Sequence, residues 1–446
     1  MLRALDVNWG WLFLRVCVGL AIISLLFLSQ RFWFRALWRM TAGWGTKALR
    51  IAARLLYLSA LILVILATYD GLRMGHGRII PRGTMITALA GLWYFSALLS
   101  YVAVKFVHGF DRIWQFAKRL LKRNVPAVAS SVSANPDVVA NPSRRYFFQT
   151  ATAAAGAAPF LSAVYGFAAE RLNYQFRYVE IPLANLPRQL DGMKIAQISD
   201  IHLSGYMPRS QVRRAVDMAN ELDADLAVVT GDFITGAGDP IEDCIDEVRC
   251  LQAPLGVWGC NGNHEIYAGV EAEAKRLFAR NGMRLLRSES AQLQFRGASF
   301  NLIGVDYQRE RTPSGRRVQM LAGVGSLVRK DMPNILLSHN PNSFNRAAEL
   351  GIELSLAGHT HGGQVQVEIL DHRLSPARFI TDYVAGLYTR PLFEPARSQA
   401  SGHFISAAAL RRPASALYVN RGLGTVGAPV RLGVPPEITL ITLRSA

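Results

Sequence analysis

Five apolar, strand-like runs in the second part of the chain are each followed by side chains that can bind a metal ion. The runs lie at 194–199, 226–230, 256–260, 334–338 and 354–357. The side chains that follow them belong to Asp200 and His202, to Asp232, to Asn263 and His264, to His339, and to His359 and His361. Ligand sites of α/β domains collect at the carboxyl ends of strands. A single polar residue after a strand is ordinary for a loop. Such residues after five strands in succession predict that they form one metal site.

The segments between these runs have helical spacing. Apolar residues recur every three or four positions in 209–222, and further helices are expected at 241–251 and 272–281. Additional strands are expected at 176–183, 299–306, 416–419 and 437–443. The alternation of short strands with helices predicts an α/β domain over residues 170–446.

The predicted site has a ligand set without sulfur. Its members are two Asp, one Asn and four His: Asp200, Asp232, Asn263, His202, His339, His359 and His361. Such nitrogen and oxygen ligands favour a pair of divalent ions such as Mn, Fe or Zn over a structural zinc. Two ions that share a carboxylate clamp a phosphate and lower the pKa of a bound water, which supplies hydroxide. A further histidine beside such a site can protonate the leaving oxygen.

The N-terminal third is more apolar and more basic than the rest. Residues 1–148 carry 19 Lys and Arg against 4 Asp and Glu, whereas the remaining residues carry 30 against 28. Apolar runs at about 9–29, 51–69 and 86–108 suit a hydrocarbon core of about 30 Å. We expect three membrane helices within 1–123 and a basic juxtamembrane segment; buried helices of a soluble domain are the alternative. This charge distribution favours membrane lipids as partners and argues against nucleic acid.

Lys and Arg in the short loops predict the orientation of these helices. Residues 30–54 carry six of them, residues 70–85 carry three, and residues 109–148 carry seven. Cytoplasmic loops are enriched in Lys and Arg, so the first and third loops are expected in the cytoplasm and the N-terminus outside. Residues 111–123 are expected to form an amphipathic helix at the membrane surface or a cytoplasmic extension of the third membrane helix.

A linker and a fourth apolar segment follow. Residues 124–148 are rich in small and polar residues and are expected to form a flexible cytoplasmic linker. The linker ends in Arg144-Arg145-Tyr146-Phe147-Phe148, and an Ala-rich run follows at 149–169. Paired arginines before a mild apolar run resemble a twin-arginine export signal, which would make the export machinery a partner. An ordinary fourth membrane helix is the alternative. Both interpretations place the C-terminal domain on the outer face of a bacterial inner membrane.

Four cysteines, Cys17, Cys244, Cys250 and Cys260, lack the CxxC spacing of a zinc site. Cys244 and Cys250 could form a disulfide if the domain lies outside the cytoplasm. Reduced, buried thiols are the alternative, and the spacing alone does not separate the two.

Five motifs of the C-terminal domain resemble, in order, those of calcineurin-like metallophosphoesterases. The motifs are Asp200-x-His202, Gly231-Asp232, Gly262-Asn263-His264-Glu265, His339 and Gly358-His359-x-His361. The resemblance extends over about 174–446 and implies an α/β fold of four αββα layers. It implies that one metal ion is bound by Asp200, His202 and His361, and the second by Asn263, His339 and His359. It also implies that Asp232 bridges the two ions and that His264 is the catalytic histidine.

The turn Asn420-Arg421-Gly422-Leu423-Gly424-Thr425 narrows the resemblance. It is similar to that of membrane-anchored or twin-arginine-exported bacterial phosphoesterases and of transmembrane proteins with a metallophosphoesterase domain. The implied function is hydrolysis of a phosphomonoester or phosphodiester, such as a lipid headgroup. The alternatives are a UDP-2,3-diacylglucosamine pyrophosphatase of lipid A synthesis and a non-catalytic membrane sensor that retains the fold. Two departures from relatives, Glu265 and the pair Asp306-Tyr307, are expected to affect substrate choice more than catalytic competence.

Overall fold

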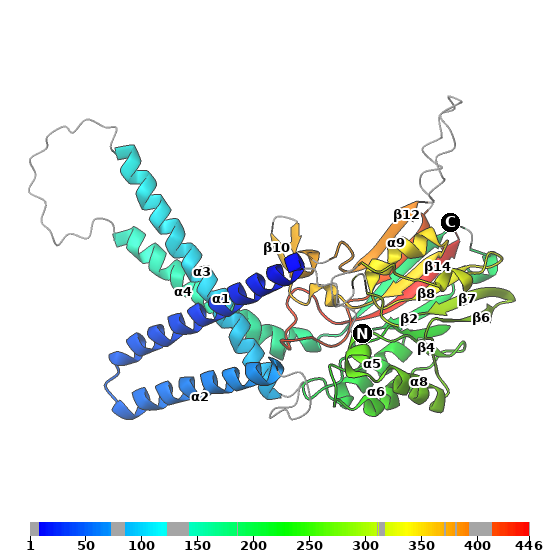
Figure 1. Cartoon of the computed structure of the whole chain (residues 1–446), viewed down its shortest axis with the longest axis horizontal. Coiled ribbons are helices and arrows are strands. Elements are labelled where there is room, and N and C mark those ends of the chain that lie inside the picture. The colour runs from blue at the N-terminus through cyan, green and yellow to red at the C-terminus, as the bar shows by residue number, and fades with distance from the viewer. Residues whose placement is uncertain are drawn as a thin grey trace, which may run out of the picture. The chain divides into compact units, whose positions relative to one another are not determined.

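Long apolar helices and a sandwich of two β-sheets form two separate units of the chain. The computed structural model describes residues 9–72, 85–122, 142–184, 186–309, 311, 317–369, 372–379, 381–391 and 413–445. The helical unit contains Trp9–Tyr69 and Leu89–Tyr165, and the sandwich unit is built on Gly166–Ala446. Figure 1 shows the elements of both units coloured along the chain.

In the described residues, the helical unit consists of most of four helices: α1 (Trp9–Ala42), α2 (Lys47–Leu72), α3 (Met85–Lys122) and α4 (Pro142–Ala168). Polar contacts join the helices within this unit. The indole of Trp93 donates to Gln30 Oε1 at 3.1 Å, and the hydroxyl of Ser100 donates to the carbonyl of Gly156 at 2.6 Å. Large apolar side chains such as Phe13, Ile23 and Phe106 are exposed along the helices, as lipid-facing side chains are.

Three segments of the described residues are long and apolar enough to cross a membrane, namely Val16–Ala42, Ala88–Leu120 and Ser143–Leu172. They overlap the first, third and fourth apolar runs of the sequence. The second run, 51–69, is helical within α2, but it is not among these three segments. The described residues thus support two of the three spans expected before residue 123, and the third, at 51–69, stays a prediction.

The helices are longer than the apolar runs predict. Residues 111–122 continue α3 without a break, which agrees with the extension of the third helix and not with a separate surface helix. Helix α4 begins at Pro142, so residues 142–148, assigned to the flexible linker, are helical instead. Arg144 forms an ion pair with Asp111, which joins the first turn of α4 to α3. The rest of the expected linker, 124–141, lies outside the described residues.

Two six-stranded mixed sheets form the centre of the sandwich unit. The first has the order β1 (Gln175–Leu183), β14 (Glu437–Ser445), β2 (Lys194–Ile198), β3 (Leu226–Val229), β4 (Val257–Gly259) and β5 (Arg284–Leu285). The second has the order β12 (Gly386–Pro391), β13 (Pro413–Val419), β9 (Leu354–Ala357), β8 (Asn334–Leu337), β7 (Ala298–Gly304) and β6 (Glu289–Phe295). A separate hairpin pairs β10 (Val367–Ile369) with β11 (His372–Leu374).

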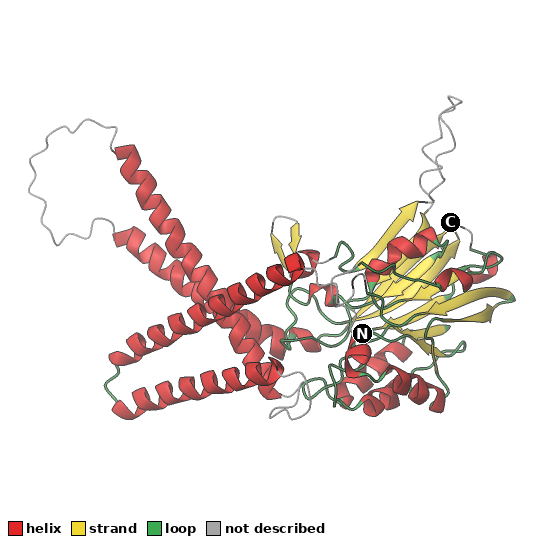
Figure 2. Cartoon of the chain, in the orientation of Figure 1, coloured by secondary structure: helices red, strands yellow, loops and turns green. Residues whose placement is uncertain are grey.

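Alternating strand residues divide between two cores, which defines the layers. On β2 and β3, Ile195 and Val228 pack between the two sheets, whereas Ala196 and Val229 pack beneath helices. The helices over the first sheet are α5 (Arg209–Asn220), α6 (Ile241–Val248) and α8 (Glu271–Arg280), and the short helix α7 (Asn263–Ala268) follows β4. Helix α9 (Phe344–Glu349) packs through Phe344 on the outer face of the second sheet. Figure 2 shows helices outside the two sheets, and the predicted four-layer fold is confirmed.

The two sheets present the ends of five strands to one region. Strands β2, β3 and β4 are parallel neighbours in the first sheet, and β8 and β9 are parallel neighbours in the second. Backbone bonds tie the loops that follow: Asp200 N donates to the carbonyl of Gly231 at 3.0 Å, and Gly358 N donates to that of His339 at 3.1 Å. The predicted strand-end residues therefore share one edge of the sandwich.

Candidate metal centre

The structure brings six of the predicted ligands into two overlapping groups. Asp200, His202, Asp232 and His361 form the first group, and Asp232, His339 and His359 form the second. Within each group, one potential ligand atom per residue lies within 4.8 Å of the others. Asp232 belongs to both groups, which is the arrangement that a carboxylate shared by two ions requires.

Distances between these atoms suit ions placed among them. In the first group, His202 Nε2 lies 3.1 Å from His361 Nε2, and His361 Nε2 lies 3.3 Å from Asp200 Oδ1. In the second group, His339 Nε2 lies 3.0 Å from Asp232 Oδ2. Ligands at about 2.0–2.2 Å from one ion, at right angles to each other, lie about 3 Å apart. The spacing therefore fits shared coordination.

Asn263, the seventh predicted ligand, has a buried oxygen without a partner. It is the first residue of α7, directly beyond β4, and its side chain is buried. Among the described residues, its Oδ1 accepts no hydrogen bond. An unsatisfied buried polar atom costs about 1–3 kcal/mol, which coordination of a cation would offset. This orphaned oxygen indicates that the site is built for a metal ion.

Backbone carbonyls orient three of the imidazoles. Nδ1 of His202 lies 3.1 Å from the carbonyl oxygen of Ile234, and Nδ1 of His339 lies 2.5 Å from the carbonyl oxygen of Thr230. Nδ1 of His264 lies 2.5 Å from the carbonyl oxygen of Thr235. A carbonyl only accepts, so each Nδ1 carries the hydrogen. Nε2 is left for a metal ion or a proton, as in metal sites whose histidines are held by outer partners.

The electrostatics of the cluster are those of a cation site. Burial lowers the pKa of His202 to about 3 and that of His359 to about 4, so both rings are neutral ligands at pH 7. Burial opposes protonation of His339 too, but the carboxylates of Asp232 and Asp200 raise its pKa to about 10. His339 in turn outweighs the effect of burial on Asp232 and holds the pKa of that carboxyl well below its usual range. Two buried carboxylates therefore draw positive charge into the site.

Five predicted ligands have strained backbone conformations. Their φ angles are positive: Asp200 48°, His202 50°, Asp232 57°, His359 75° and His361 52°. Each residue in this left-handed region costs on the order of 1–3 kcal/mol, and such residues persist where the surrounding structure enforces them. The concentration of strain on the ligands themselves is independent evidence that these loops are shaped for function.

Two glycines allow the loops to approach the carboxylates. A Cβ on Gly262 would collide with Asp232 Oδ1, and a Cβ on Gly358 would collide with Asp200 Oδ2. The backbone N–H of His359, next to Gly358, donates to Asp200 Oδ1 at 2.9 Å. These positions require glycine because a side chain would displace the carboxylates.

Glu265 holds the loop that carries Asp232. Its side chain is fully buried and accepts from the backbone N–H groups of Asp232, Phe233 and Gly262 at 2.8–2.9 Å. The sequence assigned Glu265 to substrate choice. That interpretation is wrong, because the carboxylate has three backbone donors beside Asp232 and supports the site itself.

Asp306 and Tyr307 occupy different places. Asp306 forms an ion pair with Arg287 at 2.9 Å and accepts from Asn261 at 2.8 Å, so it lies outside both ligand groups. Tyr307 reaches the site, where its hydroxyl lies 3.4 Å from His359 Nε2. Sequence reasoning gave Tyr307 no role there.

All four cysteines are free thiols, and Cys244 is buried, so the disulfide between Cys244 and Cys250 is not formed.

A buried arginine holds the C-terminal turn against the first ligand group. Gly424 N donates to the carbonyl of Asp200 at 2.7 Å, and a Cβ on Gly422 would collide with the side chain of Asp200. The guanidinium of Arg431 donates to the carbonyls of Arg421, Gly422, Gly424 and Val434 at 2.6–3.2 Å. Arg431 is fully buried. No motif pointed to this residue, since its partners are backbone carbonyls.

Comparisons with known proteins agree with this geometry. A family model described as Calcineurin-like phosphoesterase matches residues 193–363, the segment that contains all seven predicted ligands. An uncharacterized metallophosphoesterase of Bacillus subtilis, YkuE, is 30% identical over 263 residues, which is 58% of this chain and 82% of that protein. The fold and the site thus define a metal-dependent phosphoester hydrolase. The chain belongs to the calcineurin-like metallophosphoesterase family.

Two further relatives differ in how much of their length is matched. The transmembrane protein with metallophosphoesterase domain of Danio rerio is 30% identical over 299 residues, 64% of this chain and 60% of that protein. The UDP-2,3-diacylglucosamine pyrophosphatase LpxG of Chlamydia trachomatis is 27% identical over 299 residues, 58% of this chain and 86% of that protein. Transmembrane relatives accordingly exist in this family.

Proposed function

We propose that the chain is a membrane-anchored, two-metal phosphoesterase that hydrolyses a phosphomonoester or phosphodiester of a lipid headgroup. The observation that supports this proposal is the pair of ligand groups that share Asp232. The apolar helices of the same chain would keep this site in a membrane-attached protein, where lipid phosphates are abundant.

Each ligand group is assigned to one ion. Asp200, His202 and His361 would hold the first ion, and Asn263, His339 and His359 would hold the second. Asp232 would be shared by the two ions. When bound, two divalent ions supply an activated water and offset the charge of the phosphate oxygens. Mn, Fe or Zn is the proposed metal, since imidazole, carboxylate and amide ligands suit such divalent ions.

His264 is the proposed acid for the leaving oxygen. Its ring packs edge-on against that of His202, with ring centroids 4.6 Å apart, so it lies beside the ligand groups. Two bonds hold it: its backbone N–H donates to Asp232 Oδ1 at 2.9 Å, and its Nδ1 donates to Thr235. Nε2 of a protonated ring can therefore deliver a proton to an oxygen at a defined position.

Hydrolysis by the full chain tests the proposal. Protein purified in detergent and loaded with Mn should release nitrophenol from bis(4-nitrophenyl) phosphate or from 4-nitrophenyl phosphate. Chelation with EDTA should abolish the release, and re-addition of Mn, Fe or Zn should restore it. A preparation that holds two ions per chain and cleaves neither ester, nor any of a panel of lipid phosphoesters, would contradict the function.

The catalytic domain is proposed to lie on the outer face of the bacterial inner membrane, after several membrane crossings. The support is the excess of Lys and Arg in the loops 30–54 and 109–148. Alkaline phosphatase fused after Ala446 should be active, and a reporter that fluoresces only in the cytoplasm should be dark when fused there. A fluorescent fusion would place the site in the cytoplasm. A block of twin-arginine export that leaves the phosphatase fusion active would remove the export machinery as a partner.

A UDP-2,3-diacylglucosamine pyrophosphatase is the second candidate. The similarity to LpxG, which extends over 86% of that protein, favours it. Its UDP-sugar substrate is made in the cytoplasm, so a cytoplasmic result in the fusion experiment would favour this activity over the first. Release of UMP from UDP-2,3-diacylglucosamine by the purified full chain would establish it directly.

A further inference from the structure

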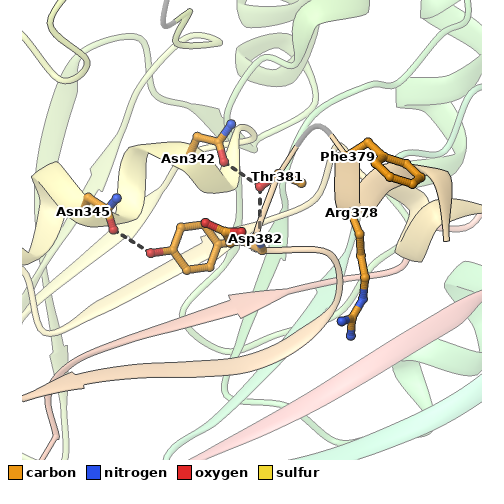
Figure 3. A pocket seen from close by; sticks show the side chains of 7 residues that line it. Asn342, Asn345, Arg378, Phe379, Thr381 and Asp382 are labelled. Atoms are coloured by element: carbon orange, nitrogen blue, oxygen red, sulfur yellow. Dashed lines mark hydrogen bonds between the residues drawn. The ribbon is translucent and has the colours of Figure 1, made fainter. Parts of the chain in front are cut away.

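A polar pocket of about 240 Å³ is lined by segments that adjoin the loops of the second ligand group. Seven residues line it: Asn342, Asn345, Arg378, Phe379, Thr381, Asp382 and Tyr383. The two asparagines come from the segment that follows β8, and the other residues come from the segment that precedes β12. Figure 3 shows the two asparagines on one side of the pocket and Arg378 and Phe379 on the other.

Both sides of the pocket are joined to loops that carry metal ligands. Asn342 follows His339 by three residues, so their Cα atoms are at most about 10–11 Å apart. Thr360, between His359 and His361, donates its hydroxyl to the carbonyl of Val384 at 2.5 Å. Val384 directly follows the pocket residue Tyr383. A group attached to a phosphate at the second ligand group therefore lies within reach of this pocket.

Among the described residues, the hydrogen bonds of the Asn342 and Asn345 side chains use their amide oxygens and leave both NH₂ groups for a ligand. Thr381 Oγ1 accepts from the backbone N–H of Tyr383 at 3.0 Å and donates to Asn342 Oδ1 at 2.6 Å. The hydroxyl of Tyr383 donates to Asn345 Oδ1 at 2.5 Å. Both amide oxygens thus face the protein. The amide nitrogens of Asn342 and Asn345 point away from these bonds in Figure 3.

The remaining lining defines the kind of ligand. Arg378 and Asp382 balance each other in charge, so the pocket does not select a net charge. A hydroxyl group both donates and accepts, and the pocket offers NH₂ and guanidinium donors together with a carboxylate acceptor. The ring of Phe379 is 95% exposed, which gives an apolar surface for the C–H face of a cyclic polyol.

We propose that this pocket binds a neutral, hydroxyl-rich group, such as a cyclic polyol or sugar, that is esterified to the scissile phosphate. This inference rests on the proposed phosphoesterase function and names its substrate class. Asp382 and the amides of Asn342 and Asn345 recognise the hydroxyls, and Phe379 packs against the ring. A site built to hydrogen-bond hydroxyls discriminates strongly against analogues that lack them.

Binding of free myo-inositol and of methyl β-d-glucoside tests the pocket without catalysis. Saturation-transfer NMR with the full chain in detergent micelles should show transfer to at least one of them. The Asp382→Asn and Asn345→Ala variants should weaken binding about tenfold, because each removes one hydrogen-bonding group. Asp331→Asn replaces another exposed Asp, which is paired with Arg329 on the turn before β8, and should leave binding unchanged. Absence of transfer to the wild type, or equal transfer to all variants, overturns the proposal.

Two fluorogenic diesters separate this proposal from the proposed function. 4-Methylumbelliferyl myo-inositol 1-phosphate carries a polyol, and bis(4-methylumbelliferyl) phosphate carries none. The Asp382→Asn variant should raise KM for the first about tenfold and leave kcat and KM for the second unchanged. Cleavage of the second with identical KM values for the first in variant and wild type would overturn the pocket and leave the phosphoesterase intact. Polyol binding without hydrolysis of either diester would support the pocket and count against the phosphoesterase.

Discussion

Replacing Asp232 by Asn is expected to lower kcat for phosphodiester hydrolysis on the order of a thousandfold. Asp232 is the only residue that belongs to both ligand groups of the described chain, so one substitution weakens both. Loss of a single group that stabilises developing charge costs about 10²–10³ in kcat, and loss of a shared metal ligand adds to this. Bis(4-nitrophenyl) phosphate hydrolysis at saturating Mn measures the effect.

Asp232→Asn removes the negative charge of the side chain and keeps its shape. Asn fills the same volume, and its oxygen can still accept from the backbone N–H of His264, which donates to Asp232 Oδ1 at 2.9 Å. The matched control is Glu353→Gln, which removes a half-buried carboxylate beside Asn334 at the other end of β8. Retention of more than a tenth of wild-type kcat by the Asp232 variant, with two ions still bound, would show that Asp232 does not bridge the ions.

Replacing Arg431 by Lys is expected to lower the melting temperature by about 5–10 °C and to weaken metal binding about 10–100-fold. Lys keeps the positive charge but cannot reach four carbonyls that the planar guanidinium reaches at 2.6–3.2 Å. The carbonyls left without donors belong to the turn that packs on Asp200. The turn should therefore loosen and release the first ligand group. Thermal unfolding and metal titration of the full chain measure the two effects.

Arg444→Lys is the matched control for this substitution. Arg444 pairs with Glu180 at the exposed edge of the first sheet, so its replacement should change neither quantity. A lower melting temperature with unchanged metal affinity in Arg431→Lys would show that Arg431 supports the fold alone. Arg431 N also donates to the carbonyl of Gly166 at 3.4 Å, at the start of the Gly166–Ala446 segment of the sandwich unit.

The site could be predicted from sequence where it depends on local pattern. Each of Asp200, Asp232 and His339 follows a short apolar strand, and strands that end at one edge bring such residues together. The supporting residues depend on contacts far apart in the chain, which local pattern does not contain. Glu265 reaches back to the backbone of Asp232, and Arg431 reaches the carbonyls of a turn seven to ten residues before it.

In the helical unit, composition predicts where the helices lie better than it predicts how long they are. Composition placed helices at the apolar runs, because residues that suit a bilayer are recognisable one by one. For α3 it left open whether residues 111–123 extend the helix, which they do as far as Lys122, and it did not predict that α4 begins at Pro142. Charged side chains such as Lys118 are compatible with a helix that extends beyond the hydrocarbon core. A hydrophobicity pattern therefore locates such helices but underestimates their length.

The positive φ angles of the predicted ligands could not be predicted from the sequence either. Asp and His adopt the left-handed region more often than most other residues, but the sequence pattern does not show at which positions they do so. The strain exists because neighbouring loops, such as the one that Gly358 allows close to Asp200, enforce it.

Anomalous diffraction from crystals of the full chain grown with Mn tests the central claim most directly. The account predicts two Mn peaks per chain. One should lie among Asp200, His202 and His361, the other among Asn263, His339 and His359, with the carboxylate of Asp232 between them. A single peak, or two peaks of which either lies away from these side chains, would contradict the shared two-metal site.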